Sequence, residues 1–203
     1  MKTICVLSRK GGVGKSTLSF HLSSLASPAA LINMDEQGSC GVWHEHRENK
    51  NEPIYVGHKE VLNLKLAGVL KQAAAKGCQY AIIDTPPHSG AEVTEAVKLA
   101  DVVVVPLEPS EFSFAAVEAT LAMVSAHDKR AVIVLSRAER DEKETRQGIA
   151  MLEGSGMPFA VVHSRVAFKR TIPAGTTVHE AKADPKAIEE IEHLWNIVQG
   201  ELK

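Results

Sequence analysis

Six short apolar runs alternate along the chain with longer stretches of helical spacing. The runs are continuous and rich in Val and Ile, which is typical of strands buried on both faces of a parallel sheet. Strands that alternate with helices predict a doubly wound α/β fold, a mostly parallel sheet flanked by helices. Such sheets bind ligands at the carboxyl ends of their strands. The predicted strands are residues 4–7, 29–34, 80–83, 102–105, 131–135 and 159–162, and the predicted helices are residues 15–26, 62–76, 92–100, 113–126 and 142–153.

Length and composition are those of an ordinary globular domain. The chain has 203 residues, of which 44% are hydrophobic and 24% charged, and no repeat or linker divides it. We therefore expect a single domain over residues 1–203. The formal net charge of −2 excludes a polycation, so any contact with nucleic acid must come from a local basic patch.

Cysteine usage and the N-terminus bear on the compartment. Cys5, Cys40 and Cys78 are widely spaced and form no C-x-x-C pair, which favours a reducing environment over a metal cluster or disulfides. The apolar stretch before Arg9 and Lys10 is too short for a signal peptide, and no run approaches the length of a membrane span. We expect a cytoplasmic protein.

The first predicted strand runs into a glycine-rich loop that carries two lysines. Residues 8–17 read Ser-Arg-Lys-Gly-Gly-Val-Gly-Lys-Ser-Thr. In a loop of this kind backbone N–H groups and a helix N-terminus cradle phosphates, a lysine reaches the β/γ oxygens and a hydroxyl holds Mg²⁺. Lys15 and Ser16 fit these two roles. Lys10 comes too early to serve the same nucleotide, so we expect it to act on a different nucleotide across a dimer interface.

Two further predicted strands end in carboxylates. Asp35 follows the second strand, and Asp84 follows the third, directly before Thr-Pro-Pro. An aspartate after a strand is often only a turn former or a helix cap. In a chain that has a P-loop earlier in the sequence, however, Asp84 has the position of the Walker B acid, which helps to hold Mg²⁺ through water. Asp35 then supplies a second acid at the same edge of the sheet.

Several segments, in this order along the chain, resemble the deviant Walker A ATPases of the ParA/MinD family, and among them most closely the small ParA-type partition ATPases. The similarity spans nearly the whole chain. The segments are residues 10–17, 35–38, 82–87, 100–106 and a late signature over 164–170 followed by 173–175.

The resemblance implies a dimer that forms on binding ATP and requires Mg²⁺. It implies that Lys10 contacts the phosphates of the partner protomer and that Lys15 contacts those of its own. It also implies that Ser16 ligates Mg²⁺, that Asp84 supports the ion without binding it directly, and that Asp35 positions the attacking water. The catalytic residues would be Lys10, Lys15 and Asp35, and the nucleotide-binding residues would be Lys10, Gly11, Gly12, Val13, Gly14, Lys15, Ser16 and Thr17.

The function implied by the resemblance is the partition or positioning of a plasmid, a chromosome or another cargo. The ATP dimer would bind nucleoid DNA nonspecifically, and a ParB-like centromere-binding or cargo-adaptor protein would stimulate a weak hydrolysis. A lysine delivered across a dimer interface acts like an arginine finger in trans. ATP hydrolysis then depends on dimer formation, so the nucleotide controls whether the protein is a monomer or a dimer.

The chain departs from the family pattern at two positions after the second strand, and from the general P-loop pattern at one. The family usually has Asp-x-Asp-Pro-Gln after the second strand, where this chain has Asn33-Met34-Asp35-Glu36-Gln37. The second acid is kept as Asp35, whereas the first acid and the proline are replaced by Asn33 and Glu36. Arg9 stands where a general P-loop has its first glycine. The resemblance therefore does not set the turnover rate.

Basic residues gather in the last third of the chain, interleaved with acids such as Glu139 and Asp141. In the family, scattered basic residues on the dimer surface bind DNA nonspecifically, and such phosphate contacts are sensitive to salt. A solvated surface is the alternative interpretation. The DNA-binding candidates are Arg165, Lys169 and Arg170.

Two other functions are compatible with the same loop. One is a membrane-associated spatial regulator like MinD, although the final helix, residues 185–200, has acids on its polar side and apolar residues that favour core packing. We therefore expect no membrane partner. The other is a metabolic or electron-transfer relative such as an amidoligase or the nitrogenase iron protein. The iron protein needs a bridging cysteine that this chain lacks after Asp84.

His44 and His46 do not indicate a metal site. They are two residues apart on a predicted helix and therefore do not share a face. We expect Trp43 beside them to be a packing residue.

Overall fold

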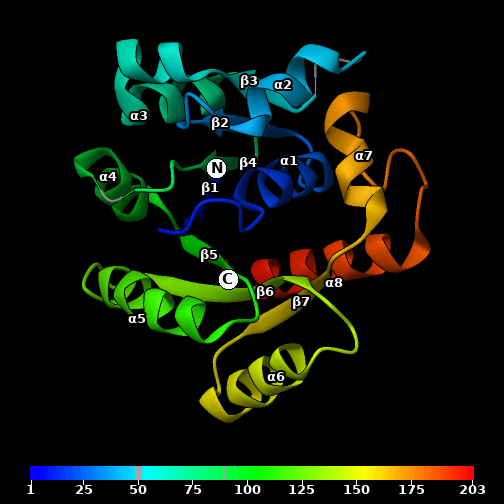
Figure 1. Ribbon diagram of the computed structural model, residues 1–203. Helices are drawn as coiled ribbons and strands as arrows, with labels where there is room; N and C mark the ends of the chain where they lie inside the picture. Colours follow the sequence, from blue (N-terminus) through cyan, green and yellow to red (C-terminus); the bar gives the residue numbers. More distant parts are fainter. Residues whose placement is uncertain (49–51, 89) are drawn as a thin grey trace.

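The computed structural model describes residues 1–48, 52–88 and 90–203, which form a seven-stranded sheet (Figure 1). The strand order is β3-β2-β4-β1-β5-β6-β7, and each neighbouring pair is parallel. This confirms the doubly wound α/β prediction. The strands are β1 (Lys2–Val6), β2 (Ala29–Asn33), β3 (Ile54–Val56), β4 (Tyr80–Asp84), β5 (Val102–Leu107), β6 (Arg130–Ala138) and β7 (Phe159–His163).

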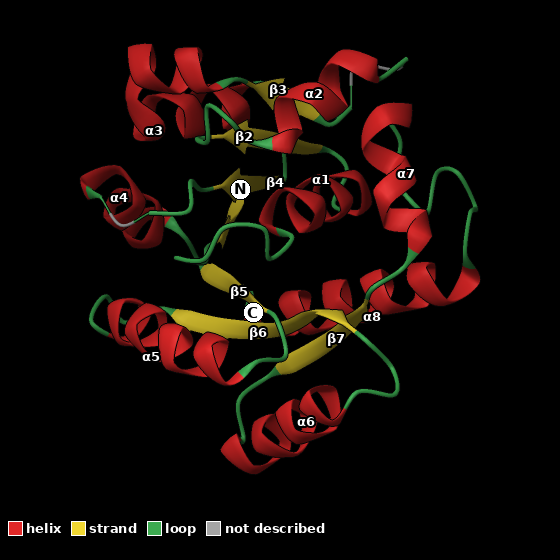
Figure 2. Ribbon diagram, viewed as in Figure 1, coloured by secondary structure: helices red, strands yellow, loops and turns green. Residues whose placement is uncertain are grey.

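Helices cover both faces of the sheet (Figure 2). Successive residues of a strand point to opposite faces, so Ile4 and Val6 pack into one core and Cys5 and Leu7 into the other. Burial on both faces explains why the strands read as continuous apolar runs. One face carries α1 (Lys15–Leu25), α2 (Ser39–His46), α7 (Val166–Ala174) and α8 (Pro185–Glu201), and the other carries α3 (His58–Ala75), α4 (Ala91–Leu99), α5 (Glu111–Ser125) and α6 (Lys143–Ser155).

The six predicted strands and the predicted helices are present, with bounds that differ by a few residues. The prediction for the final helix is also confirmed, because Ile191, Leu194 and Val198 of α8 are buried against the sheet. Two elements were not predicted. β3 has only three residues, and α7 includes Pro173, a residue that normally ends a helix.

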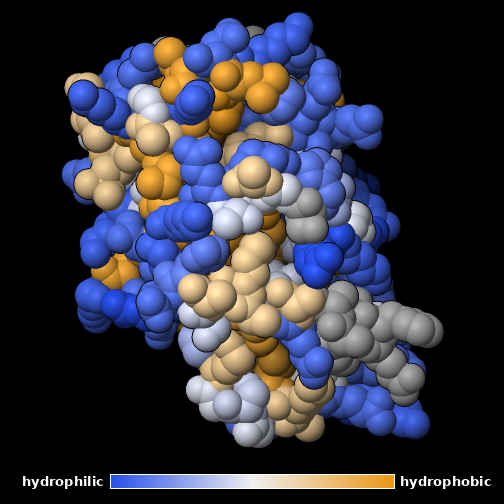
Figure 3. Space-filling model, turned by 90° about the vertical axis from the view of Figure 1, so that its left-hand side faces the viewer, coloured by the Kyte–Doolittle hydropathy of each residue, from blue (hydrophilic) through white to orange (hydrophobic). Residues whose placement is uncertain are grey.

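The face over α3, α4 and α5 mixes hydrophilic and hydrophobic groups, with the hydrophobic groups gathered toward α3 (Figure 3). Leu62 and Leu64 of α3 are exposed there. No helix within the described residues is both long enough and apolar enough to cross a membrane.

The strand order brings the predicted functional loops together. β1 lies between β4 and β5, and it is here that the chain switches from one side of the sheet to the other. In the register, Val6 of β1 and Asn33 of β2 both pair with Asp84 at the end of β4. The loops that follow β1, β2 and β4 therefore start at the same level of the sheet edge.

Arg47 joins the end of α2 to the segment after α7. Its guanidinium carbon lies 4.5 Å from the centroid of the Trp43 ring, and Nη2 lies 2.6 Å from Glu180 Oε1. Trp43 Nε1 donates to the carbonyl of Thr176 at 2.8 Å. Gly175 packs so closely on the backbone of His46 and Arg47 that there is no room for a Cβ. Trp43 is fully buried, which confirms its predicted role in packing.

We expect Glu180→Gln to destabilise the protein at neutral pH by about 1–2 kcal/mol, because it removes the charge that pairs with the buried Arg47. Burial alone would raise the pKa of Glu180, but hydrogen bonds from Arg47 and Ser24 outweigh it and lower the pKa to about 2. A carboxylate with a lowered pKa stabilises the fold above its ordinary pKa, and this contribution disappears as the pH falls from about 4.5 toward 2.

Urea unfolding at several pH values measures this difference. The free energies of wild type and variant should converge on acidification. Glu192→Gln is a matched control, because Glu192 pairs with His179 in an exposed position, and it should change stability by less than about 0.5 kcal/mol. Equal stability of Glu180→Gln and wild type at pH 7 would contradict the assignment.

Candidate nucleotide-binding site

Two left-handed glycines shape the loop between β1 and α1. Gly12 and Gly14 have φ angles of 80° and 89°, a conformation that favours glycine. Gly14 is the N-cap of α1 and makes no side-chain capping bond, so the first-turn N–H groups of the helix are not used by a cap. A helix start of this kind attracts anions, and phosphate in particular.

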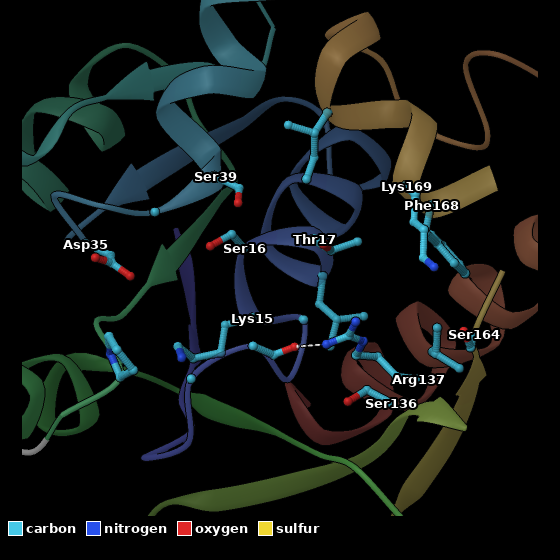
Figure 4. A pocket seen from close by; sticks show the side chains of 18 of the residues that line it. Lys15, Ser16, Thr17, Asp35, Ser39, Ser136, Arg137, Ser164, Phe168 and Lys169 are labelled. Carbon is cyan, nitrogen blue, oxygen red and sulfur yellow. Dashed lines mark hydrogen bonds between the residues drawn. The ribbon is translucent and has the colours of Figure 1, made fainter. Parts of the chain in front are cut away.

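β6 holds the carbonyl groups of this loop from behind. Ser136 Oγ donates to Val13 O at 2.7 Å, and Arg137 Nη1 donates to Gly12 O at 2.6 Å, the bond drawn in Figure 4. Arg137 has a φ of 54° and lies at a register shift between β6 and β7. This irregularity turns the arginine toward the loop. The carbonyls of Gly12 and Val13 are thereby occupied by β6.

Lys15 lies at the bottom of the site and is 6% exposed. Its Nζ donates to the carbonyl of Lys10 at 3.2 Å. Burial lowers the pKa of Lys15, and the negative charges of Asp84 and Asp35 oppose the shift. The ammonium is thus held inside the loop, near two carboxylates.

Asp84 is fully buried at the end of β4. It accepts hydrogen bonds from two helices, α1 after the phosphate loop and α2 after β2. Ser19 of α1 donates to Oδ1 at 3.0 Å, and the thiol of Cys40 in α2 donates to Oδ2 at 3.2 Å. Burial raises the pKa of Asp84, whereas hydrogen bonds from Ser16, Cys40 and Ser19 and the charge of Lys15 lower it. The structure therefore places the predicted metal-site residues Ser16 and Asp84 in direct contact.

The loop after β2 holds Asp35 at the rim of the site. The side chain of Asn33 accepts from Asp35 N and donates to the Tyr55 hydroxyl, both at 3.0 Å. An amide supplies this donor and this acceptor at once, which is a physical reason for Asn33 where the family usually has an acid. Asp35 Oδ1 accepts from Gln37 N at 3.0 Å, which closes a tight turn.

These groups line a pocket of about 390 Å³, a volume suited to a small-molecule ligand. Figure 4 shows Lys15, Ser16 and Thr17 from the phosphate loop, Asp35 from one side, and Phe168 and Lys169 of α7 from the other. The described lining residues are Gly11, Gly12, Gly14, Lys15, Ser16, Thr17, Leu18, Asp35, Gln37, Gly38, Ser39, Pro87, Ser136, Arg137, Val162, His163, Ser164, Arg165, Phe168, Lys169 and Ile172.

The predicted residues Lys15, Ser16, Thr17 and Asp35 thus lie around one pocket. The contributions of Ser136 and Arg137 from β6 and of Phe168 from α7 were not predicted. Ser136 and Arg137 directly follow the predicted strand at residues 131–135, and this position was the signal that could have identified them. The late signature already contained Phe168, but nothing in its spacing related it to the phosphate loop.

Lys10 and Val13, which were also predicted to bind the nucleotide, are not among the described residues that line this pocket; both border a small neighbouring cavity. The ammonium of Lys10 lies 2.8 Å from Oε2 of Glu108, which follows β5. Lys10 and Lys15 therefore point to different places, as their different positions in the loop predicted.

The three DNA-binding candidates have different environments. Arg165 is mostly buried, with Nη2 lying 2.6 Å from Glu190 and Nη1 3.4 Å from Asp184, and hydrogen bonding to Glu190 raises its pKa. Its guanidinium attaches the start of α7 to α8 and is therefore engaged within the fold instead of being exposed for DNA. Lys169 and Arg170 are exposed on α7, and Lys169 also borders the pocket.

Comparison with solved structures agrees with this architecture. Apo McdA from Cyanothece has a TM-score of 0.78 at 18% identity, with 98% of this chain and 99% of that chain covered. The septum site-determining protein MinD from Pyrococcus horikoshii, complexed with Mg-ADP, has a TM-score of 0.76 at 16% identity, with 97% and 95% covered. Similarity at these identities establishes the fold.

Sequence comparison extends the match beyond the fold. The maintenance of carboxysome distribution protein A of Halothiobacillus neapolitanus is 25% identical over 213 residues, covering 97% of this chain and 95% of that protein. The family model described as the CobQ/CobB/MinD/ParA nucleotide binding domain matches residues 4–178. The chain therefore belongs to the CobQ/CobB/MinD/ParA nucleotide-binding family.

Proposed function

We propose that the protein is a Mg²⁺-dependent ATPase that dimerises on ATP and positions a large cargo. The observation that carries the proposal is the separation of the two loop lysines. Lys15 lines the pocket, whereas the ammonium of Lys10 lies 2.8 Å from Glu108, and neither Lys10 nor Glu108 is among the described residues that line the pocket. A second loop cation outside the lining of its own pocket is suited to act on the nucleotide of another protomer.

The residues present fit a nucleoside triphosphate with its metal ion. The uncapped start of α1 and Lys15 would hold the β- and γ-phosphates, and the hydroxyl of Ser16 would ligate Mg²⁺. Asp84, buried against Ser16, would fix that hydroxyl and any water on the ion. Bound Mg²⁺ would supply positive charge to the phosphate oxygens.

Asp35 is the residue that we propose to orient the attacking water. It is partly exposed at the pocket rim, and the bonds from Asn33 and Gln37 fix its turn. Because phosphoryl transfer depends mainly on positioning and on cations, an acid held in place opposite Lys15 is sufficient for this role. Lys10 of a partner would complete the positive charge around the γ-phosphate.

Cargo positioning is the biological role that we propose for this switch. The Halothiobacillus relative is named for the maintenance of carboxysome distribution, and plasmids and chromosomes are the other cargo classes. An adaptor protein on the cargo would stimulate hydrolysis, and the ATP dimer would bind nucleoid DNA nonspecifically through Lys169, Arg170 and neighbouring cations. A MinD-like membrane role has less support, since α8 uses its apolar residues in the core.

The central test compares Lys10→Ala with Lys15→Ala. Lys15→Ala should abolish ATP binding. Lys10→Ala should bind ATP as wild type does, yet lose ATP-dependent dimerisation and reduce hydrolysis by about 10²-fold, because a cation at the transition state is missing. Isothermal titration, sedimentation velocity and phosphate release provide the three measurements. Lys71→Ala, at an exposed position on α3, is the matched control. Normal dimerisation and hydrolysis by Lys10→Ala would refute the proposal.

Gly38→Ala tests the turn that holds Asp35. A Cβ on Gly38 would lie 3.0 Å from Asp35 Cβ and 3.1 Å from Asp35 O, so the turn must shift. We expect hydrolysis to fall about ten-fold through misplacement of the acid, with little change in affinity for the analogue AMPPNP. Gly154→Ala on α6 is the control, because its Cβ would meet nothing within 4 Å. A parallel loss of affinity would place the effect on the phosphate loop instead.

Arg170→Ala tests the DNA surface. Removal of an exposed arginine that binds a phosphate should weaken binding equally for unrelated duplexes and reduce the slope of log affinity against log salt by about 1. Fluorescence anisotropy in the presence of AMPPNP at several salt concentrations measures both quantities. Lys71→Ala serves again as the control. An effect that depends on the DNA sequence, or the absence of any effect, would exclude this surface.

A further inference from the structure

Glu108, which directly follows β5, links the phosphate loop after β1 to the end of β6. Its Oε2 lies 2.8 Å from Lys10 Nζ, and its Oε1 lies 3.2 Å from Arg137 Nη1. The same Arg137 nitrogen donates to the carbonyl of Gly12. One carboxylate therefore links the first loop lysine to the arginine that holds the loop backbone.

The strand order creates this cluster. β5 lies between β1 and β6, so the residues after β1, after β5 and near the end of β6 meet at one edge of the sheet. Glu108 directly follows β5, and Arg137 is turned toward it by its left-handed backbone, with a φ of 54°. A sheet position and a backbone irregularity, both fixed by the fold, thus place the carboxylate between two cations.

The cluster determines where Lys10 points in a single protomer. Lys10 borders a small cavity with Leu107 and Val117, next to β5, whereas the nucleotide pocket is lined by Lys15 and its neighbours. The Glu108 carboxylate is negatively charged, as the phosphates of a nucleotide are, so it competes with a second protomer's nucleotide for the ammonium of Lys10. Contact with Glu108 therefore disfavours the proposed contact in trans.

We propose that Glu108 is a positioning residue that retains Lys10 on its own protomer, and that phosphate oxygens of the partner's nucleotide replace the carboxylate when the dimer forms. This inference rests on the proposed function, in which Lys10 acts across the interface. Glu108 then sets how readily the chain dimerises at a given ATP concentration. It competes with dimer formation, and Arg137 keeps the carboxylate in place.

The expected effect is moderate. The Lys10 and Glu108 side chains are 42% and 27% exposed, and ion pairs with this exposure contribute little because water and salt screen them. Since two symmetric contacts break on dimerisation, removing Glu108 should strengthen the dimer about three- to ten-fold at low salt. The difference should shrink as salt is raised.

The first measurement is the dimer dissociation constant of the full chain with AMPPNP and Mg²⁺, obtained by sedimentation velocity at low and high salt. We expect Glu108→Gln to dimerise more tightly than wild type at low salt, and Glu118→Gln, an exposed position on α5 with the same loss of charge, to match wild type. Glu108→Asp should lie between wild type and Glu108→Gln. Unchanged or weaker dimerisation of Glu108→Gln would overturn the inference.

A second measurement uses the nucleotide-free protein and does not depend on dimerisation. The rate at which acetic anhydride modifies Lys10, followed by mass spectrometry, should rise in Glu108→Gln, while the rate at Lys71 stays constant. An unchanged rate at Lys10 would overturn the proposal that Glu108 retains Lys10.

If wild type does not dimerise with AMPPNP, the proposed function fails, whatever the modification rates. If wild type dimerises and Glu108→Gln behaves identically, only the role of Glu108 fails.

Discussion

The buried carboxylate of Asp84 is the interaction around which the site is organised. It is fully enclosed at the end of β4 and accepts bonds from Ser19 on α1 and from Cys40 on α2. A buried charge requires such donors, since its desolvation costs several kcal/mol. Meeting this requirement fixes α1 and α2 relative to the central strand. The phosphate loop before α1 and the Asp35 turn before α2 are positioned as a result.

A second set of contacts extends this organisation to α7. Trp43 and Arg47 of α2 bind the segment that follows α7, through the carbonyl of Thr176 and the carboxylate of Glu180. α7 in turn brings Phe168 to the pocket and exposes Arg170. The turn that holds Asp35, the pocket wall and the proposed DNA surface are thus parts of one packed unit. A ligand that moves α2 would have to move or strain these contacts.

Much of the fold could be predicted from the sequence, because strands buried on both faces leave continuous apolar runs and glycines mark the phosphate loop. Lys15, Ser16 and Asp84 lie close together because β1 and β4 are neighbours, and it was the phosphate loop and the aspartate after a strand that predicted a shared site. β3 and α7 were missed, the first because three residues carry too little periodicity and the second because of Pro173. The pairing of Arg137 with Glu108 could not be predicted, since it depends on an irregularity in β6 and on the adjacency of β1, β5 and β6. Arg165 was predicted to be a surface cation because its ion-pair partners, Asp184 and Glu190, are about 20 residues away in the sequence and gave no local sign of the pairing.

The central claim is that the two loop lysines serve two different nucleotides. A crystal structure of the protein with AMPPNP and Mg²⁺ tests this claim most directly. We predict two protomers facing each other, with Lys15 on the phosphates of its own nucleotide and Lys10 on those of its partner's, released from Glu108. A nucleotide-bound protomer in which Lys10 remains on Glu108, or contacts its own nucleotide, would contradict the account.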